Sequence, residues 1–316
     1  MIATPPAERG KPELILPVFQ HLSEVGATGE ATPFIRYLKT DALERQRLVR
    51  ERVEQWLGKN PGEKNDAYRV TREDGLLSLS VSGLNVKSLA PLRGLPLDFL
   101  ALSGCSVTDL EPLRGMRLVK LHITRNPITD LSPLEGMPLN VLTMDHVNVT
   151  DLSPLAEMSL KYLQMSYCRL ITDLSPLRGA PLQTLIAYDC QAEDYSPLRG
   201  MPLRKLVLRR STFRDCTILQ GMPLETLELP GRVSDLSPLA GLPLRALLID
   251  KKTTASLEPL LRVSALERLT VTAPIENVLP LRHHPALKSI NHNDSGLRPV
   301  AEFWADYDAQ QAAGKK

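Results

Sequence analysis

The sequence predicts an α/β solenoid, in which short coils each add one strand to a parallel β-sheet. Three observations predict it: a DLSPL-like segment recurs ten times, successive copies are 20–22 residues apart, and an L-x-x-L-x-apolar pattern stands before each copy. Periods in this range are typical of solenoids, because each period supplies one coil. The ten copies begin at Ser88, Asp109, Asp130, Asp151, Asp173, Asp194, Asp215, Asp235, Ser256 and Asn277.

The upstream pattern indicates one short strand per coil. Its last two apolar residues stand two positions apart, as Leu121 and Ile123 do, which is the alternation of a strand with one face in the core. Strands that recur once per coil stack in register about 4.8 Å apart. We therefore expect a parallel sheet with leucines pointing inward and the residues between them facing solvent.

The DLSPL segment predicts how each coil turns back behind its strand. In the copy at 130–134, Ser132 is expected to cap free amides and Pro133 to occupy the first helical position. Asp130 is expected to accept hydrogen bonds from backbone amides at the corner. Gly136 permits a positive φ that ends the turn. Because the segment is too short for a full α-helix, we expect 3₁₀ or single-turn helices on the convex side.

These residues together resemble the leucine-rich repeat family in its short bacterial form, over about 76–292. The resemblance implies a horseshoe of ten to eleven repeats with the parallel sheet on its concave face. It also implies an inner ladder of Asn or Cys, three residues after the last strand apolar. Counting places Arg232 and Lys252 on this ladder, so we expect loosened geometry over 230–255. The regular ladder positions are Cys105, Asn126, Val147, Cys168, Cys190 and Ser211.

A narrower resemblance comes from the sequences that flank the array. YRVTREDGLLSLSVSG before it and LKSINHNDSGLRPVAEFWADYDAQ after it are similar to the flanks of repeat regions that accompany some bacterial serine/threonine kinases. The chain has no glycine-rich phosphate loop, no HRD and no DFG. The resemblance implies a regulatory or sensor fragment of a larger signalling enzyme as an alternative function.

Both flanks are predicted to cap the ends of the solenoid, which would otherwise expose leucines. Residues 1–30 are rich in Pro, Gly and Glu and are expected to be disordered. Residues 31–75 are expected to form a helical cap, with a helix over 40–57 that Thr40 or Asp41 caps and Gly58 follows. The apolar face of that helix is expected to hold Leu43, Leu48, Val53 and Leu57.

Residues 293–316 are predicted to form the second cap and a tail. A short helix over 298–309 carries Phe303, Trp304 and Tyr307. We expect these rings to plug the core rather than to bind a partner, because buried aromatic side chains contribute large apolar areas.

Composition excludes several classes of function. Lys plus Arg number 38 and Asp plus Glu 36, so the chain lacks the basic excess of a nucleic-acid binder. No basic segment followed by an apolar stretch marks a secretion signal, and no apolar run is long enough to span a membrane. These features predict a cytoplasmic protein with no membrane contact.

No catalytic, cofactor or metal motif is found. HExxH, GxSxG and CxxC are all absent, so we expect no enzyme activity and no cofactor. His283 and His284 are expected at the surface. The ladder cysteines are expected to be buried and inert. Cys168 and Cys190 fall in adjacent coils, where a disulfide is geometrically possible, although we favour reduced thiols.

The predicted concave face is where the coils differ most. The third to seventh coils bring together large polar and aromatic side chains, and Tyr and Arg commonly anchor protein interfaces. Ile186, Val207 and Leu248 are expected to add an exposed apolar strip. We therefore predict a non-enzymatic scaffold that binds a protein partner of unknown identity through this face. The predicted contact residues are His122, Arg125, Asp145, His146, Tyr162, Tyr167, Ile186, Tyr188, Val207, Arg209 and Arg210.

Two alternatives to protein binding stay open. The varied residues of this face also fit an unconstrained solvated surface. Arg125, Arg209 and Arg210 would suit a nucleic acid or an anionic glycan, although the near-zero net charge disfavours that function.

Overall fold

The computed structural model of the protein divides into two compact units, Met1–Val141 and Leu142–Lys316, called here the first and second unit. The expected disordered segment 1–30 and the capping candidates Thr40 and Asp41 lie outside the described residues. The structure describes residues 42–58, 67–73, 75–86, 88–253, 255–293 and 296–313.

The first unit contains the start of the solenoid. Its elements are α3 (Ala42–Trp56), β1 (Tyr68–Glu73), β2 (Leu76–Ser82), η2 (Ala90–Leu92), β3 (Phe99–Ser103), η3 (Glu111–Leu113), β4 (Lys120–His122) and η4 (Ser132–Leu134). Strands β2, β3 and β4 are parallel neighbours in chain order, and β1 joins β2 antiparallel. The antiparallel strand is a correction, because the sequence predicts only helix over 31–75.

The second unit continues the same pattern to the other end. Strand β5 (Val141–Thr143) begins at the boundary between the units. The other elements are η5 (Ser153–Leu155), β6 (Tyr162–Gln164), η6 (Ser175–Leu177), β7 (Thr184–Ile186), η7 (Ser196–Leu198), β8 (Lys205–Val207), η8 (Cys216–Leu219), β9 (Thr226–Pro230), η9 (Ser237–Leu239), β10 (Ala246–Lys252), η10 (Glu258–Arg262), β11 (Arg268–Thr272), α4 (Ile275–Val278), η11 (Leu279–His283), β12 (Ser289–His292), β13 (Arg298–Pro299) and α5 (Val300–Ala313). Strands β6 to β12 are parallel neighbours in chain order, and β13 closes the edge antiparallel.

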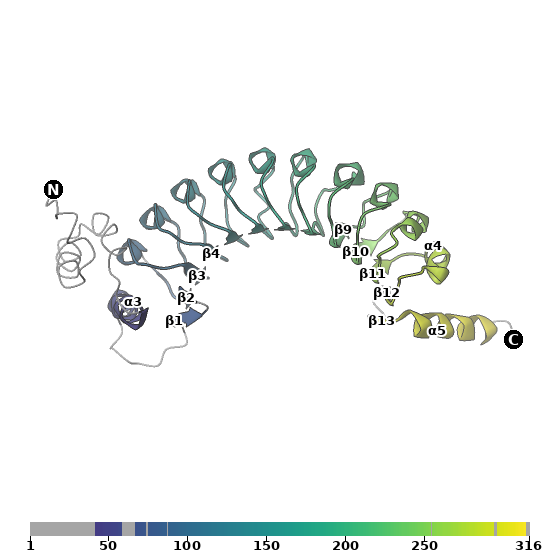
Figure 1. Cartoon of the computed structure of the whole chain (residues 1–316), viewed down its shortest axis with the longest axis horizontal. Coiled ribbons are helices and arrows are strands. Elements are labelled where there is room, and N and C mark those ends of the chain that lie inside the picture. The colour runs from purple at the N-terminus through teal and green to yellow at the C-terminus, as the bar shows by residue number, and fades with distance from the viewer. Residues whose placement is uncertain are drawn as a thin grey trace. The chain divides into compact units, whose positions relative to one another are not determined.

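Each coil has its strand on one side and a short helical turn on the opposite side (Figure 1). Apolar side chains between the two fill the core. In the second unit one core column runs in register from β6 to β12, and every member is buried, so the core is continuous from coil to coil. Its members are Leu163, Leu185, Leu206, Leu227, Leu247, Leu269 and Ile290.

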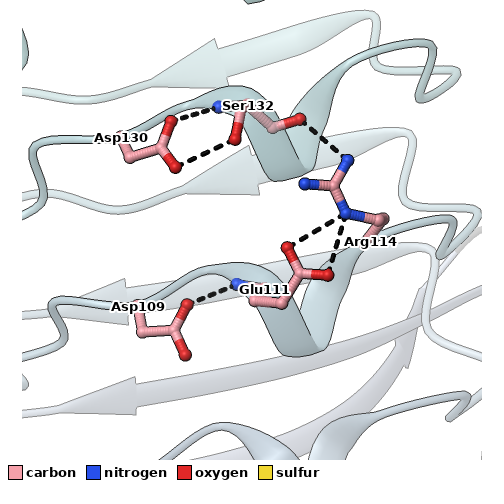
Figure 2. A network of polar contacts seen from close by, with 5 residues as sticks. All are labelled: Asp109, Glu111, Arg114, Asp130 and Ser132. Carbon is pink, nitrogen blue, oxygen red and sulfur yellow. Dashed lines mark hydrogen bonds and ion pairs between the residues drawn. The ribbon is translucent and has the colours of Figure 1, made fainter.

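The DLSPL segments form the predicted 3₁₀ helices, but the serine does not have the predicted role. Asp130 Oδ1 accepts the backbone N–H of Ser132 at 2.7 Å, and the Ser132 hydroxyl donates to Asp130 Oδ2 at 2.9 Å (Figure 2). The serine hydroxyl thus caps no amide, because the aspartate has already taken the free N–H. Pro133 is the second residue of the 3₁₀ helix, one position later than predicted. The same Asp–Ser pairing lowers the pKa of Asp151 and Asp194.

An arginine also links two neighbouring helical turns in the first unit. Arg114 Nε donates to Glu111 in its own turn, and Arg114 Nη1 donates to the Ser132 carbonyl of the next turn at 3.2 Å (Figure 2). Because both charged side chains are about half exposed, the ion pair itself contributes little stability.

Glycine with a positive φ ends most of the helical turns, as predicted, and Glu157 takes its place in one coil with φ 62°. Replacing Glu157 with Gly should raise the free energy of unfolding by about 0.5–1 kcal/mol, because an L residue is strained in this region. Urea denaturation measures the change. Ala156, with φ −58°, is the control, and Ala156→Gly should lower stability. Changes of the same sign in both variants would show that φ is not the cause.

The inner ladder is built around buried hydrogen bonds. Asn126 Oδ1 accepts the backbone N–H groups of Cys105 and Val107 at 3.0 and 3.1 Å, and Asn126 Nδ2 donates to the carbonyls of Leu102 and Thr124. The Asn side chain therefore joins two coils in the core, where water cannot replace it.

Counting misplaced the ladder in the irregular coils. Arg232 is exposed and the next residue, Val233, is buried instead. Thr253 is also buried, and its hydroxyl accepts the N–H of Ala255 at 3.1 Å. The pairing of β10 with β11 shifts register between Ile249 and Lys252, inside the region where loosened geometry was expected.

The four cysteines are buried, free thiols. The Cys168 thiol donates to the Met144 carbonyl at 3.0 Å, and burial raises its pKa to about 11. His284, expected at the surface, is buried instead. Its Nδ1 accepts two backbone N–H groups, so Nε2 carries the proton toward the Val263 carbonyl.

The first cap uses α3 and β1 together. Val49 and Val53 are fully buried, and Trp56 Nε1 donates to the Ser88 carbonyl at 2.9 Å. The Tyr68 hydroxyl on β1 donates to buried Glu54 on α3. Leu43 lies where side chains are not described, and Val49 was missed by sequence reasoning.

The second cap is α5, which runs four residues past the predicted end. Phe303 and Trp304 are buried, with ring centroids 4.9 Å apart, and Phe303 contacts His292 of β12. The guanidinium of Arg282 lies over the Trp304 ring.

Candidate functional site

Each strand in the middle of the array leads into one residue with a left-handed backbone. In most of these coils the N–H of this residue donates to a strand-end carbonyl of the next coil, as Tyr167 does to Tyr188 at 2.8 Å, so the position continues the sheet ladder. The first two coils use glycine there, and the next five use residues with side chains. The column contains Gly83, Gly104, Arg125, His146, Tyr167, Asp189 and Arg210, with φ between 55° and 67°.

Side chains at these positions are strained. A non-glycine residue in the left-handed region costs about 1–2 kcal/mol, and a bulky residue there is an outlier. Gly83 and Gly104 show that the turn itself needs no side chain. Strained residues of this kind cluster at functional sites, where the side chain is needed for something other than folding.

In the second unit, four coils in succession stack their side chains at the ends of the strands. The His146 and Tyr167 rings lie 4.3 Å apart and nearly parallel, and the Tyr167 and Tyr188 rings lie 5.0 Å apart. The guanidinium groups of Arg209 and Arg210 lie 5.6 and 5.8 Å from the Tyr188 ring centre. We call these five residues the ring ladder.

The ring ladder packs its members against one another but stays partly exposed. Tyr167 stacks on His146 and lies against Tyr188 at a tilt of 50°, and Tyr188 has two guanidinium groups over its ring. Tyr167 is still 37% exposed. Ring edges carry partial positive charge, and hydroxyl, imidazole and guanidinium groups donate hydrogen bonds. The exposed surface is therefore rich in donors.

Arg209 and Arg210 differ in their partners. Arg209 lies between Glu228 at 3.7 Å and Asp250 at 3.4 Å, and its buried Nε has no partner among the described residues. Arg210 is exposed and donates to the Tyr188 hydroxyl at 3.4 Å, and no ion pair of Arg210 is found in the described part of the chain. Arg210 thus remains open to an external anion.

Asp145 and Tyr162 belong to a separate network. Asp145 accepts the backbone N–H of Ser166 at 2.6 Å and the Gln164 amide at 2.5 Å. The Tyr162 hydroxyl donates to Gln164 at 2.6 Å, and burial raises the Tyr162 pKa. These side chains hold each other in place and are less free to contact a partner than the sequence predicts.

The remaining predicted contact residues differ in burial and in the unit to which they belong. Val207 is only 6% exposed, which contradicts the expected apolar strip, because its short side chain lies between Ile186 and Glu228 in register. Ile186 is half-buried. His122 and Arg125 belong to the first unit, where the His122 ring packs on Phe99 at 4.8 Å.

Sequence reasoning missed the residues around the one 22-residue step. Arg169 pairs with buried Asp189 at 2.6 Å, and Leu170 is 53% exposed. The extra residue was the available signal, because an insertion in a fixed period must bulge out of the coil.

Within the residues that the structure describes, no group of His, Cys, Asp and Glu side chains could hold a metal ion. None of the helices described has the length and apolar character to cross a bilayer.

Comparison with solved structures identifies the fold. An internalin, InlF from Listeria monocytogenes, matches with a TM-score of 0.60 and 26% identity, over 78% of this chain and 81% of that chain. The chain has a leucine-rich repeat fold. Its strand-per-coil pairing, 3₁₀ turns and inner ladder confirm the predicted fold class.

Two further leucine-rich repeat structures from Listeria monocytogenes are similar at TM-scores of 0.42. Internalin C2 is 23% identical over 78% of this chain and 92% of that chain. The functional domain of InlJ, described as including a cysteine ladder, is 17% identical over 69% of this chain and 53% of that chain. No protein-family model and no curated protein matches the chain.

Proposed function

We propose that the protein is a non-enzymatic scaffold whose strand face, in the second unit, binds a protein partner with the ring ladder at the centre of the contact. The observation that carries the proposal is the left-handed column. Large side chains occupy strained positions at His146, Tyr167 and Arg210, where glycine serves equally well for folding in the first two coils. Binding explains why that strain is kept.

The size and chemistry of this face suit a protein. Seven strands, β6 to β12, at about 4.8 Å each span roughly 30 Å, which matches the width of an ordinary interface. Tyrosine and arginine supply large contact areas together with directional hydrogen bonds. The acidic residues adjacent to the rings in sequence are Asp145 and Asp189. Asp145 is already engaged by Ser166 and Gln164, and Asp189 by Arg169, which favours recognition over acid–base chemistry.

The alternative is a regulatory or sensor fragment of a larger signalling enzyme such as a serine/threonine kinase. The flanking sequences that β1 and α5 carry favour it. Capture of a kinase with the purified chain as bait would support this alternative. We also propose the cytoplasm as the compartment, because four buried free thiols suit a reducing environment.

The Tyr167→Gly variant tests the proposal. It should lose partner capture, while its free energy of unfolding stays the same or rises by about 1 kcal/mol, because glycine relieves the strained φ. The measurement is quantitative pull-down from lysate, paired with urea denaturation.

Glu157→Gly is the matched control, because it relieves the same backbone strain at the helical-turn side of its coil. It should keep capture at the parent level. Equal capture by the parent and Tyr167→Gly would refute binding at the ring ladder, and equal loss in both variants would assign the effect to folding.

A further inference from the structure

We infer that the ring ladder recognises an acidic segment of the protein partner, with a carboxylate seated at Arg210 and Tyr188. This inference rests on the proposed function and adds the chemistry of the partner. Two observations support it. Some groups of the ring ladder are free to bind, and some of the arginines in or beside it are already neutralised by ion pairs.

Ring geometry disfavours two common partners of tyrosine. Proline-rich segments and sugars both stack on open ring faces. The Tyr167 ring is already stacked on His146 at 4.3 Å, and the Tyr188 ring has two guanidinium groups over it at 5.6 and 5.8 Å. Hydroxyls, positive ring edges and a guanidinium remain, and these groups favour an anion.

Charge places the anion at one end of the ladder. The Arg169 charge is neutralised by Asp189 at 2.6 Å, and the Arg209 charge by Glu228 and Asp250. Arg210 keeps its charge and has the Tyr188 hydroxyl beside it. Arg232, exposed in the turn after β9, adds a second positive charge at the strand ends of the next coil.

The same face favours an isolated carboxylate over a continuous polyanion. Among the side chains that the structure describes, Glu228 and Asp250 both pair with Arg209 alone, which leaves about one net negative charge in this group of three. A nucleic acid or sulfated glycan lying along the face would be repelled by this negative charge. A protein segment can instead place a basic side chain there.

The spacing of the coils sets a pattern for the segment. Arg210 follows β8 and Asp250 lies on β10, two strand spacings away, or about 10 Å. An extended chain covers that distance in about three residues. We expect an acidic residue about three positions from a basic one.

Selection from a random dodecapeptide library displayed on phage, with the whole chain as bait, tests the inference. Enriched peptides should contain Asp or Glu about three residues from Lys or Arg. Synthetic copies, measured by fluorescence anisotropy, should bind Arg210→Gly roughly tenfold to a hundredfold more weakly than the parent chain. Glycine suits the left-handed backbone here, so this variant should stay folded.

Charge reversal at Arg210 tests most directly whether the acidic residue of the peptide contacts this side chain. Arg210→Glu should weaken binding further, and a peptide in which the acidic residue becomes lysine should recover it. Glutamate is tolerated in this backbone region, as Glu157 shows. Glu157→Gly should bind every peptide as the parent does.

Several results would overturn the inference. They are enrichment of proline-rich or uncharged aromatic peptides, no enrichment at all, unchanged affinity of Arg210→Gly, or displacement of the peptide by heparin with a steep salt dependence. If Tyr167→Gly still loses partner capture in those cases, the proposed function stands and only the acidic partner is wrong. If Tyr167→Gly captures the partner normally, the proposed function fails first.

Discussion

Leu206→Ala should lower the free energy of unfolding by about 2–5 kcal/mol, because it removes fully buried methyl groups and leaves a cavity. Leu206 lies in register between Leu185 and Leu227, and both of these are also fully buried. The three leucines touch the same core volume, so the cavity weakens three coils at once. Each coil of a solenoid depends on its neighbours, so nearby coils should lose protection as well.

Urea denaturation followed by circular dichroism measures the total loss, and amide hydrogen exchange locates it. Leu248→Ala is the matched control, because Leu248 belongs to the second next strand, β10, and is only half-buried on the strand face. It should lose clearly less stability than Leu206→Ala. Equal losses would mean that the two faces of the sheet are packed alike, contrary to the structure.

Asn126→Ala should be destabilising by about 3–5 kcal/mol, although it removes only a small side chain. Oδ1 of Asn126 satisfies the N–H groups of Cys105 and Val107, and Nδ2 satisfies the Leu102 and Thr124 carbonyls. Alanine would remove this partner from the Cys105 and Val107 N–H groups and from the Leu102 carbonyl, whereas the Thr124 carbonyl keeps the N–H of Gly104. Each buried backbone group left without a partner costs about 1–3 kcal/mol. The structure around the alanine can relax and admit water, so the total loss of stability should be smaller than the sum of the largest individual costs.

Two further variants separate hydrogen bonding from volume. Asn126→Asp keeps the acceptor but loses both donors and buries a charge, so it should be at least as unstable as Asn126→Ala at neutral pH. Asn126→Cys keeps one weak donor, as Cys105 does toward the Val81 carbonyl at 3.3 Å, and should fall between parent and alanine. A loss below about 1 kcal/mol for Asn126→Ala would show that the ladder bonds are dispensable.

Most of the fold could be predicted because the information repeats. Ten copies of the same segment report one local structure, so drift in a single copy, such as Glu157 in place of glycine, does not hide the pattern. The caps lack this redundancy. Strand β1 pairs antiparallel with β2 and helix α3 buries Val49, and neither follows from a period.

For the candidate site, the sequence predicted only which positions of successive coils lie on the same face. Strand alternation placed Tyr167, Tyr188 and Arg210 on one side of the coils, and the structure brings them together. Strand alternation did not predict that Val207 is buried or that Arg209 forms ion pairs with two carboxylates. Those outcomes depend on the lengths and rotamers of neighbours about 21 residues away in sequence.

The sequence by itself determined that this chain winds into coils of about 21 residues with an aliphatic core, because hydrophobic period and turn chemistry act within each coil. Only the tertiary structure decided which side chains of the strand face remain open. The Tyr167 ring stacks on His146, guanidinium groups lie over the Tyr188 ring, and ion pairs neutralise Arg169 and Arg209, which leaves Arg210 available. The physical reason is that pairing between coils depends on distances of a few ångströms, which the order of residues along the chain does not contain.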